Sequence, residues 1–132
     1  MLSAQRLKGA YMTDVIDIDQ LKLMTAEDAE LAEEALGIFR SQAEMWGRLL
    51  DPRSGAESWA DACHAIKGAA RSVGAMELGE ACAKAETLGR SGEVSPAQAG
   101  VALSEVKDKL GAAIEAIAEL EHKLATTGKF PG

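Results

Sequence analysis

Hydrophobic residues along most of the chain are spaced by three and four positions, which is the spacing of an amphipathic helix. The pattern begins with enough apolar residues for a short helix over residues 16–24. A longer helix follows, for which Thr25 and Asp28 offer a capping pair. It ends at Asp51, because the proline at position 52 disfavours helix at the residue before it. Its predicted buried positions are Leu31, Ala35, Ile38, Phe39, Met45, Trp46 and Leu49.

Three more helices are predicted after this proline. The first begins near Ser54 and ends at Gly74, a residue type suited to the left-handed position that closes many helices. The second ends in the glycine-containing run 89–92, and the third starts with a capping box of Ser95 and Gln98 that has proline at the first helical position. Their predicted core positions are Trp59, Ala62, Cys63, Ile66, Ala70, Val73, Leu78, Ala81, Cys82, Ala85, Leu88, Val106, Leu110, Ala113, Ile114, Ile117, Leu120 and Leu124.

These patterns predict an all-α fold, an antiparallel up-down four-helix bundle with a short extra N-terminal helix. No β-branched alternation bounded by turns is present, so no strands are expected. The expected organisation is a flexible segment over residues 1–15, the bundle over residues 16–125 and a frayed tail over residues 126–132.

The composition argues against two classes of function, nucleic-acid binding and membrane-surface binding. The chain of 132 residues has a formal net charge of −7, whereas nucleic-acid binding and membrane-surface binding both need clustered Lys and Arg. Aromatic residues make up only 4% of the chain, so the core must be built mainly from aliphatic side chains and alanine. Such a core suits helices that pack closely together.

Compartment and oligomeric state are suggested by what the sequence contains and lacks. Cys63 and Cys82 have no C-x-x-C spacing and are expected to be small buried residues in a reducing compartment. No apolar run approaches the roughly 18 residues of a membrane span, and no secretory signal is visible. We therefore expect a cytoplasmic protein, and a monomer, because no coiled-coil seam beyond the bundle is apparent.

One predicted helix face gathers residues with reactive chemistry. On a helical wheel of about 100° per residue, His64 lies roughly 170° from the apolar stripe, and Lys67, Gly68 and Arg71 share its outward side. An exposed histidine and two cations are by themselves ordinary surface residues. Gly68 is harder to explain, because glycine inside a helix costs about 1 kcal/mol relative to alanine. One turn from His64, it leaves room for another protein's backbone or for a phosphoryl group.

The segment from His64 to Gly68, followed by Gly74, Ala75 and Leu78, resembles the signature H-x-x-K-G-x-x-x-x-x-G-A of histidine-phosphotransfer (HPt) domains. A bare H-x-x-K-G is a weak signal. The second glycine, ten residues after the histidine and at the end of a predicted helix, makes the resemblance more specific.

The resemblance covers about residues 16–124. Phe39 in the preceding helix and Glu86 in the following one lie where HPt domains commonly carry Phe and Glu. The chain departs from the family at Ala69 and Ala70, where serine is frequent, although the site depends little on that hydroxyl.

The resemblance implies a phosphorelay, in which a histidine takes a phosphoryl group from an aspartyl phosphate and passes it to another aspartate. It implies four roles: His64 as phosphoacceptor, Lys67 as the main electrostatic partner, Arg71 as a secondary one, and Gly68 as the steric clearance. Imidazole is partly neutral near physiological pH and is then a nucleophile. Cationic side chains can stabilise the phosphoryl oxygens after transfer.

The expected partners are receiver domains of response regulators or of hybrid histidine kinases. No cofactor is expected on this chain, and the Mg²⁺ of the reaction would lie in the acidic pocket of the receiver domain. The chain is expected to be a phosphohistidine carrier rather than an autonomous kinase, because it has no glycine-rich nucleotide motif. Docking is expected to bury apolar surface of the His64 helix and of the helix ending near Leu50.

Three other interpretations stay open. The chain could be a stand-alone relative of the phosphotransfer domain of chemotaxis kinases, because its local chemistry would look the same. A helical adaptor could bind receivers without transferring phosphate, although the intact trio of His64, Lys67 and Gly68 argues against it. A di-iron bundle could use the carboxylate-x-x-His pairs at 61–64 and 119–122, but its ligands must face the bundle interior. The wheel places both pairs on outward faces.

Overall fold

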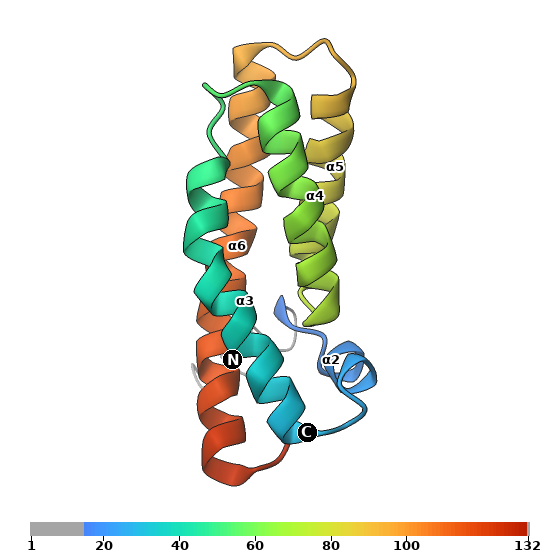
Figure 1. Ribbon diagram of the computed structural model, residues 1–132, viewed down its shortest axis with the longest axis vertical. Coiled ribbons are helices and arrows are strands. Elements are labelled where there is room, and N and C mark those ends of the chain that lie inside the picture. The colour runs from blue at the N-terminus through green and yellow to red at the C-terminus, as the bar shows by residue number, and fades with distance from the viewer. Residues whose placement is uncertain (1–14, 132) are drawn as a thin grey trace, which may run out of the picture.

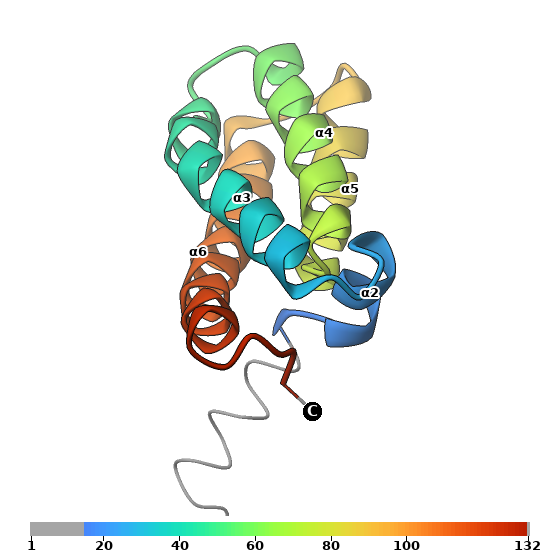
Figure 2. The same cartoon turned by 60° about the horizontal axis from the view of Figure 1, so that its bottom comes forward.

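A computed structural model describes residues 15–131, and between these residues the chain is helical without any strand. The helices are α2 (Ile18–Met24), α3 (Ala29–Leu49), α4 (Ala56–Ser72), α5 (Met76–Arg90) and α6 (Pro96–Thr127). The four long helices α3 to α6 form an up-down bundle, and short α2 packs beside one end of it (Figures 1 and 2). The predicted all-α bundle with a short extra helix is therefore confirmed. Residues 1–14 of the predicted flexible segment lie outside the described residues.

The core lies between the four long helices and is built mainly from alanine and aliphatic side chains. The predicted stripe of α4 is buried at every position, with Trp59 and Ile66 almost inaccessible to solvent. The stripe of α6 is also buried, apart from Ile114, which is partly exposed. Phe39 and Trp46 of α3 pack edge to face, with ring centroids 5.3 Å apart. These two helices follow their hydrophobic periodicity closely, as expected for amphipathic elements.

The predicted buried face of α3 is partly wrong. Phe39 and Trp46 are buried, but four other predicted core residues are exposed by 44% to 53%: Leu31, Ile38, Met45 and Leu49. Ala32, Leu36 and Ala43 take their place in the core. Apolar residues cover two neighbouring stripes of this helix, and periodicity alone cannot decide which stripe packs inward. The second stripe remains as an apolar surface along α3.

The start of α3 also differs from the prediction. Asp28, not Thr25, caps the helix, and its carboxylate accepts from the backbone N–H groups of Glu30 and Leu31. Thr25 is buried at the end of α2, where its hydroxyl donates to the carbonyl of Leu21 at 2.7 Å. A threonine hydroxyl that bonds to the preceding turn is no longer available as a helix N-cap.

Two further helix boundaries shift by one or two residues, and a third lies within its predicted run. Helix α4 starts after Gly55 rather than at Ser54, whose hydroxyl instead donates to the carbonyl of Asp51. Helix α5 ends at Arg90, inside the predicted glycine-containing run 89–92. Helix α6 starts with the predicted Ser95 capping box and extends to Thr127, two residues beyond the predicted end.

Gly74 closes α4 and also anchors the chain that leads into α2. Its φ of +84° is left-handed, and a Schellman pattern forms as the N–H groups of Gly74 and Ala75 donate to the carbonyls of Arg71 and Ala70. The carbonyl of Gly74 accepts from the N–H of Asp17 at 2.8 Å. A Cβ atom at position 74 would lie 2.5 Å from the carbonyl oxygen of Asp17, so glycine is required there.

We expect Gly74→Ala to lower the free energy of unfolding by about 2–5 kcal/mol, combining left-handed strain with the clash against backbone. Equilibrium urea unfolding measures the change. Gly100→Ala is the matched control, because an added Cβ meets open space on α6 and should raise stability by up to about 1 kcal/mol. A Gly74→Ala protein as stable as wild type would contradict the anchoring role.

Candidate functional site

Helices α4 and α5 form a close hairpin that creates the site. Small residues allow the close approach, since a Cβ atom at Gly89 of α5 would lie 2.8 Å from both the Cβ of Ala60 and the ring of Trp59. Only a short turn around Gly74 joins the two helices, so they run antiparallel side by side (Figures 1 and 2). Residues on the facing sides of α4 and α5 are thereby brought together.

His64 projects from α4 with its side chain 64% exposed. Its Nδ1 atom lies 2.9 Å from Oε2 of Glu86 on α5. An ionised carboxylate can only accept, so Nδ1 carries the hydrogen and donates it to Glu86. In the neutral imidazole the other ring nitrogen, Nε2, then carries no hydrogen and presents its lone pair as a nucleophile.

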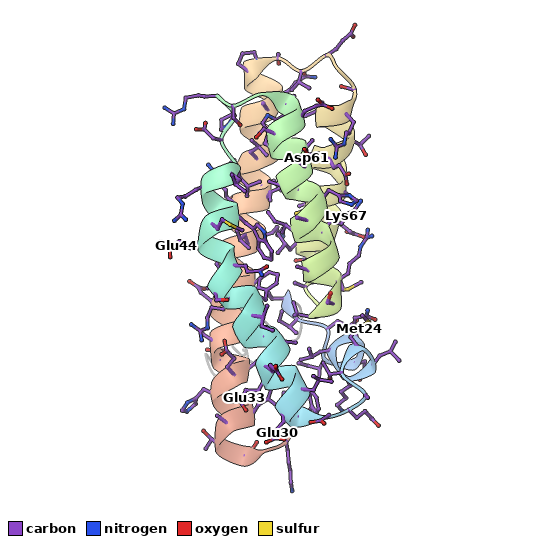
Figure 3. All side chains as sticks on the ribbon, viewed as in Figure 1. Met24, Glu30, Glu33, Glu44, Asp61 and Lys67 are labelled. Carbon is purple, nitrogen blue, oxygen red and sulfur yellow. The ribbon has the colours of Figure 1, made fainter. Side chains whose placement is uncertain are left out.

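Lys67 forms a hydrogen bond with the other carboxylate oxygen of Glu86. Its Nζ donates to Oε1 of Glu86 at 2.7 Å, and the two side chains are only 22% and 15% exposed. This hydrogen bond is the main cause that lowers the pKa of Glu86, and the charges of His64 and Lys67 lower it further against the opposing effect of burial. Glu86 is therefore ionised at neutral pH. Figure 3 shows Lys67 projecting from α4 on the side of α5.

A second ion pair borders this cluster. Arg90 on α5 contacts Oδ1 of Asp61 at 2.8 Å, and its other terminal nitrogen lies 3.6 Å from Oε2 of Glu86. Sequence reasoning assigned no role to Arg90 and none to Glu86 beyond its match to the family pattern. Arg90 follows Glu86 by four residues, so both lie on one face of α5, and this spacing was the available signal.

Gly68 lies one turn after His64 and is exposed. No heavy atom among the described residues, apart from its own neighbourhood on the helix, comes within 4 Å of a Cβ atom added there. Packing within the chain therefore does not require glycine at this position. The surface beside the imidazole is open for a docking molecule.

Arg71 is not part of the cluster around Glu86. Its side chain lies across Gly79 of α5, with Cγ 3.3 Å and Nε 3.6 Å from the place where a Cβ of residue 79 would be. The structure thus brings His64 and Lys67 together on Glu86 with Gly68 adjacent, and it leaves Arg71 farther along α4.

The arrangement required for a di-iron centre is not formed by the described residues. Asp61, His64, Glu119 and His122 are all exposed rather than turned into the bundle interior. Within residues 15–131, no group of three or more potential His, Cys, Asp or Glu ligands could hold a metal ion. None of the helices in this range is long and apolar enough to cross a membrane.

The cluster predicts a specific pH dependence of stability. A carboxyl with a lowered folded-state pKa contributes stability above its ordinary value, here 4.5, and loses it as pH falls through the folded value. We expect Glu86→Gln to lower the free energy of unfolding at neutral pH, with the difference from wild type shrinking below pH 4.5. Urea unfolding of both proteins across this range measures it.

Glu34→Gln is the control for this measurement, because Glu34 is exposed and makes no ion pair with the described residues. Its stability should follow wild type at every pH. A Glu86→Gln protein with the same offset from wild type at all pH values would contradict the coupling of Glu86 to Lys67 and His64.

A helical bundle that presents a histidine, a lysine and a glycine on one exposed helix defines the class of protein. The family model of the Hpt domain matches residues 18–121, which is most of the chain. The chain therefore belongs to the Hpt domain family, whose members serve histidine phosphotransfer in two-component systems. Searches of curated proteins and of solved structures gave no significant match.

Proposed function

We propose that this protein relays a phosphoryl group between aspartates of receiver domains, with His64 as the phosphoacceptor. One observation carries the proposal. His64 is exposed, its Nδ1 is held by Glu86, and its Nε2 is left as an outward nucleophile. The proposed reaction takes place in the cytoplasm, and the protein acts in it as a monomer.

The transfer step needs only the two proteins and the partner's metal ion. The lone pair of Nε2 attacks the phosphorus of the receiver's aspartyl phosphate. The bond between phosphorus and the carboxylate oxygen breaks, and the aspartate leaves with the electron pair. The reverse step on a second receiver returns the phosphoryl group to a carboxylate. The Mg²⁺ belongs to the acidic pocket of the receiver.

Glu86 and Lys67 have separate roles in this step. Phosphorylation at Nε2 while Nδ1 keeps its hydrogen gives the ring a positive charge, and the carboxylate of Glu86 faces that charge at 2.9 Å. Lys67 uses one N–H on Glu86 and has others to donate to a phosphoryl oxygen. Most of the catalysis is positioning and electrostatic stabilisation, as is usual for phosphoryl transfer.

The second apolar stripe of α3 supplies a docking surface for the receiver. Arg40 bonds to Glu121 of α6 at 2.8 Å, and the exposed apolar residues lie roughly 160° around α3 from Arg40, on the side of α4. Because α3 and α4 run antiparallel from the loop at 50–55, Ile38 and Met45 flank the level of His64. The partner would thus contact apolar α3 side chains and the small outward residues of α4 together.

The proposal is tested by a transfer in two legs. A receiver domain labelled as the aspartyl phosphate is mixed with the protein and Mg²⁺, the labelled protein is isolated, and a second receiver is then added. A relay protein takes up the label in the first leg and loses it to the receiver in the second. A protein that binds receivers, as judged by calorimetry, but takes up no label is an adaptor, and that result would reject the relay.

A further inference from the structure

Three cationic side chains lie on or beside the His64 face, and two of them are already paired. Lys67 is bonded to Glu86, and Arg90 contacts both Asp61 and Glu86. Arg71 is exposed and makes no ion pair with any residue between 15 and 131. It is the one cation of the three that is not paired with a carboxylate of the described residues.

Arg71 lies next to residues of two neighbouring helices, α5 and α2. Gly79 of α5 provides a flat surface for it, because a side chain at position 79 would occupy the space where Cγ and Nε of Arg71 lie. The backbone carbonyl of Arg71 accepts from Nε2 of Gln20, which ties this turn of α4 to α2. The Arg71 side chain thus lies over Gly79 of α5, on the turn of α4 that contacts α2.

The distance between His64 and Arg71 along α4 determines which anion can bind to Arg71. Arg71 follows His64 by two helical turns, about 10 Å along the axis. A phosphoryl group on Nε2 would lie beside Lys67, one turn from His64, whereas the Arg71 side chain lies over Gly79 of α5. The anion that pairs with Arg71 therefore comes from the docked molecule.

We infer that Arg71 binds a carboxylate on the docking face of the receiver domain and positions the partner, without touching the transferred phosphoryl group. This inference rests on the proposed relay function. A cation at this position also fits the net charge of −7, because a chain of this charge would otherwise repel the acidic pocket of a receiver. Arg71 is thus a positioning residue for the partner rather than the secondary phosphoryl ligand that the sequence suggested.

Steady-state transfer from a phosphorylated receiver distinguishes a role of Arg71 in positioning the partner from a role in binding the phosphoryl group. We expect Arg71→Ala to raise the KM for the receiver about five- to tenfold and to leave kcat within about twofold, because a contact at the edge of an interface acts on association. Arg71→Lys should restore part of the loss, and the KM of Arg71→Ala should depend less on salt. Arg48→Ala is the control, because Arg48 is an exposed arginine of α3 that pairs with Glu44.

A variant at Gly79 tests the same role from the other helix. Gly79→Leu should displace the Arg71 side chain and raise KM, and it should have no further effect in the Arg71→Ala background. Urea unfolding of each variant verifies that the fold is retained.

The outcomes distinguish this inference from the proposed function. A wild-type protein that takes up no phosphate would reject the relay itself. With wild-type transfer intact, a lower kcat at unchanged KM in Arg71→Ala would place Arg71 on the phosphoryl group and overturn the inference. Unchanged KM and kcat would overturn it as well.

Discussion

Replacing His64 by glutamine is expected to abolish phosphoryl acceptance, with a loss of more than about a thousandfold in rate. A glutamine amide nitrogen has no basic lone pair with which to attack phosphorus, whereas Nε2 of imidazole has one. The fold should be unaffected, because the side chain is 64% exposed and its hydrogen bond to Glu86 is its main polar contact. Transfer from a labelled receiver, together with thermal unfolding, measures both effects.

His122→Gln is the matched control, since His122 is the other histidine of the chain and is exposed on α6. This variant should accept phosphate like wild type. Label that persists on the His64→Gln protein, or label that is lost from the His122→Gln protein, would refute the assignment of the phosphoacceptor.

Replacing Gly68 by glutamine is expected to lower kcat/KM for transfer about a hundredfold while leaving the bundle at least as stable as wild type. The added side chain would stand one turn from His64, in the open space through which the receiver's aspartyl phosphate must approach. Glutamine is also the better helix former by roughly 0.5–1 kcal/mol, so urea unfolding should show unchanged or higher stability. A loss of activity with a gain of stability identifies a residue kept for function.

Gly111→Gln provides the comparison, because Gly111 is an exposed glycine within α6 that also has open space around its Cβ position. It should show the gain in stability without the loss of transfer. Unimpaired transfer by Gly68→Gln would show that the receiver does not approach over this turn of α4.

Much of the fold could be predicted because its determinants are local. The Ser95 capping box predicts the start of α6, and a single apolar stripe predicts its buried face. Helix α4 ends just before Gly74, whose left-handed backbone conformation favours glycine. Helix α3 could not be predicted as well, because it carries two adjacent apolar stripes. The choice between them depends on how α3 packs against α4 and α6, which hydrophobic periodicity does not encode.

The site shows the same division between local and tertiary information. The wheel placed His64, Lys67 and Gly68 on one outward face, since all three lie within about one turn of the same helix. The hydrogen bonds of Glu86 and the ion pair of Arg90 with Asp61 depend on how closely α4 and α5 pack. That packing comes from the small residues at the interface, notably Gly89 against Ala60.

The central claim is that His64 itself carries the phosphoryl group. The most direct test is to phosphorylate the protein from a receiver domain with Mg²⁺ and to locate the modification by tandem mass spectrometry under neutral to alkaline conditions, which preserve phosphohistidine. The account predicts one phosphoryl group, labile to acid and stable to base, on the imidazole of His64. A phosphoryl group on any other residue, or a protein that stays unmodified while the receiver hydrolyses its own phosphate, would contradict it.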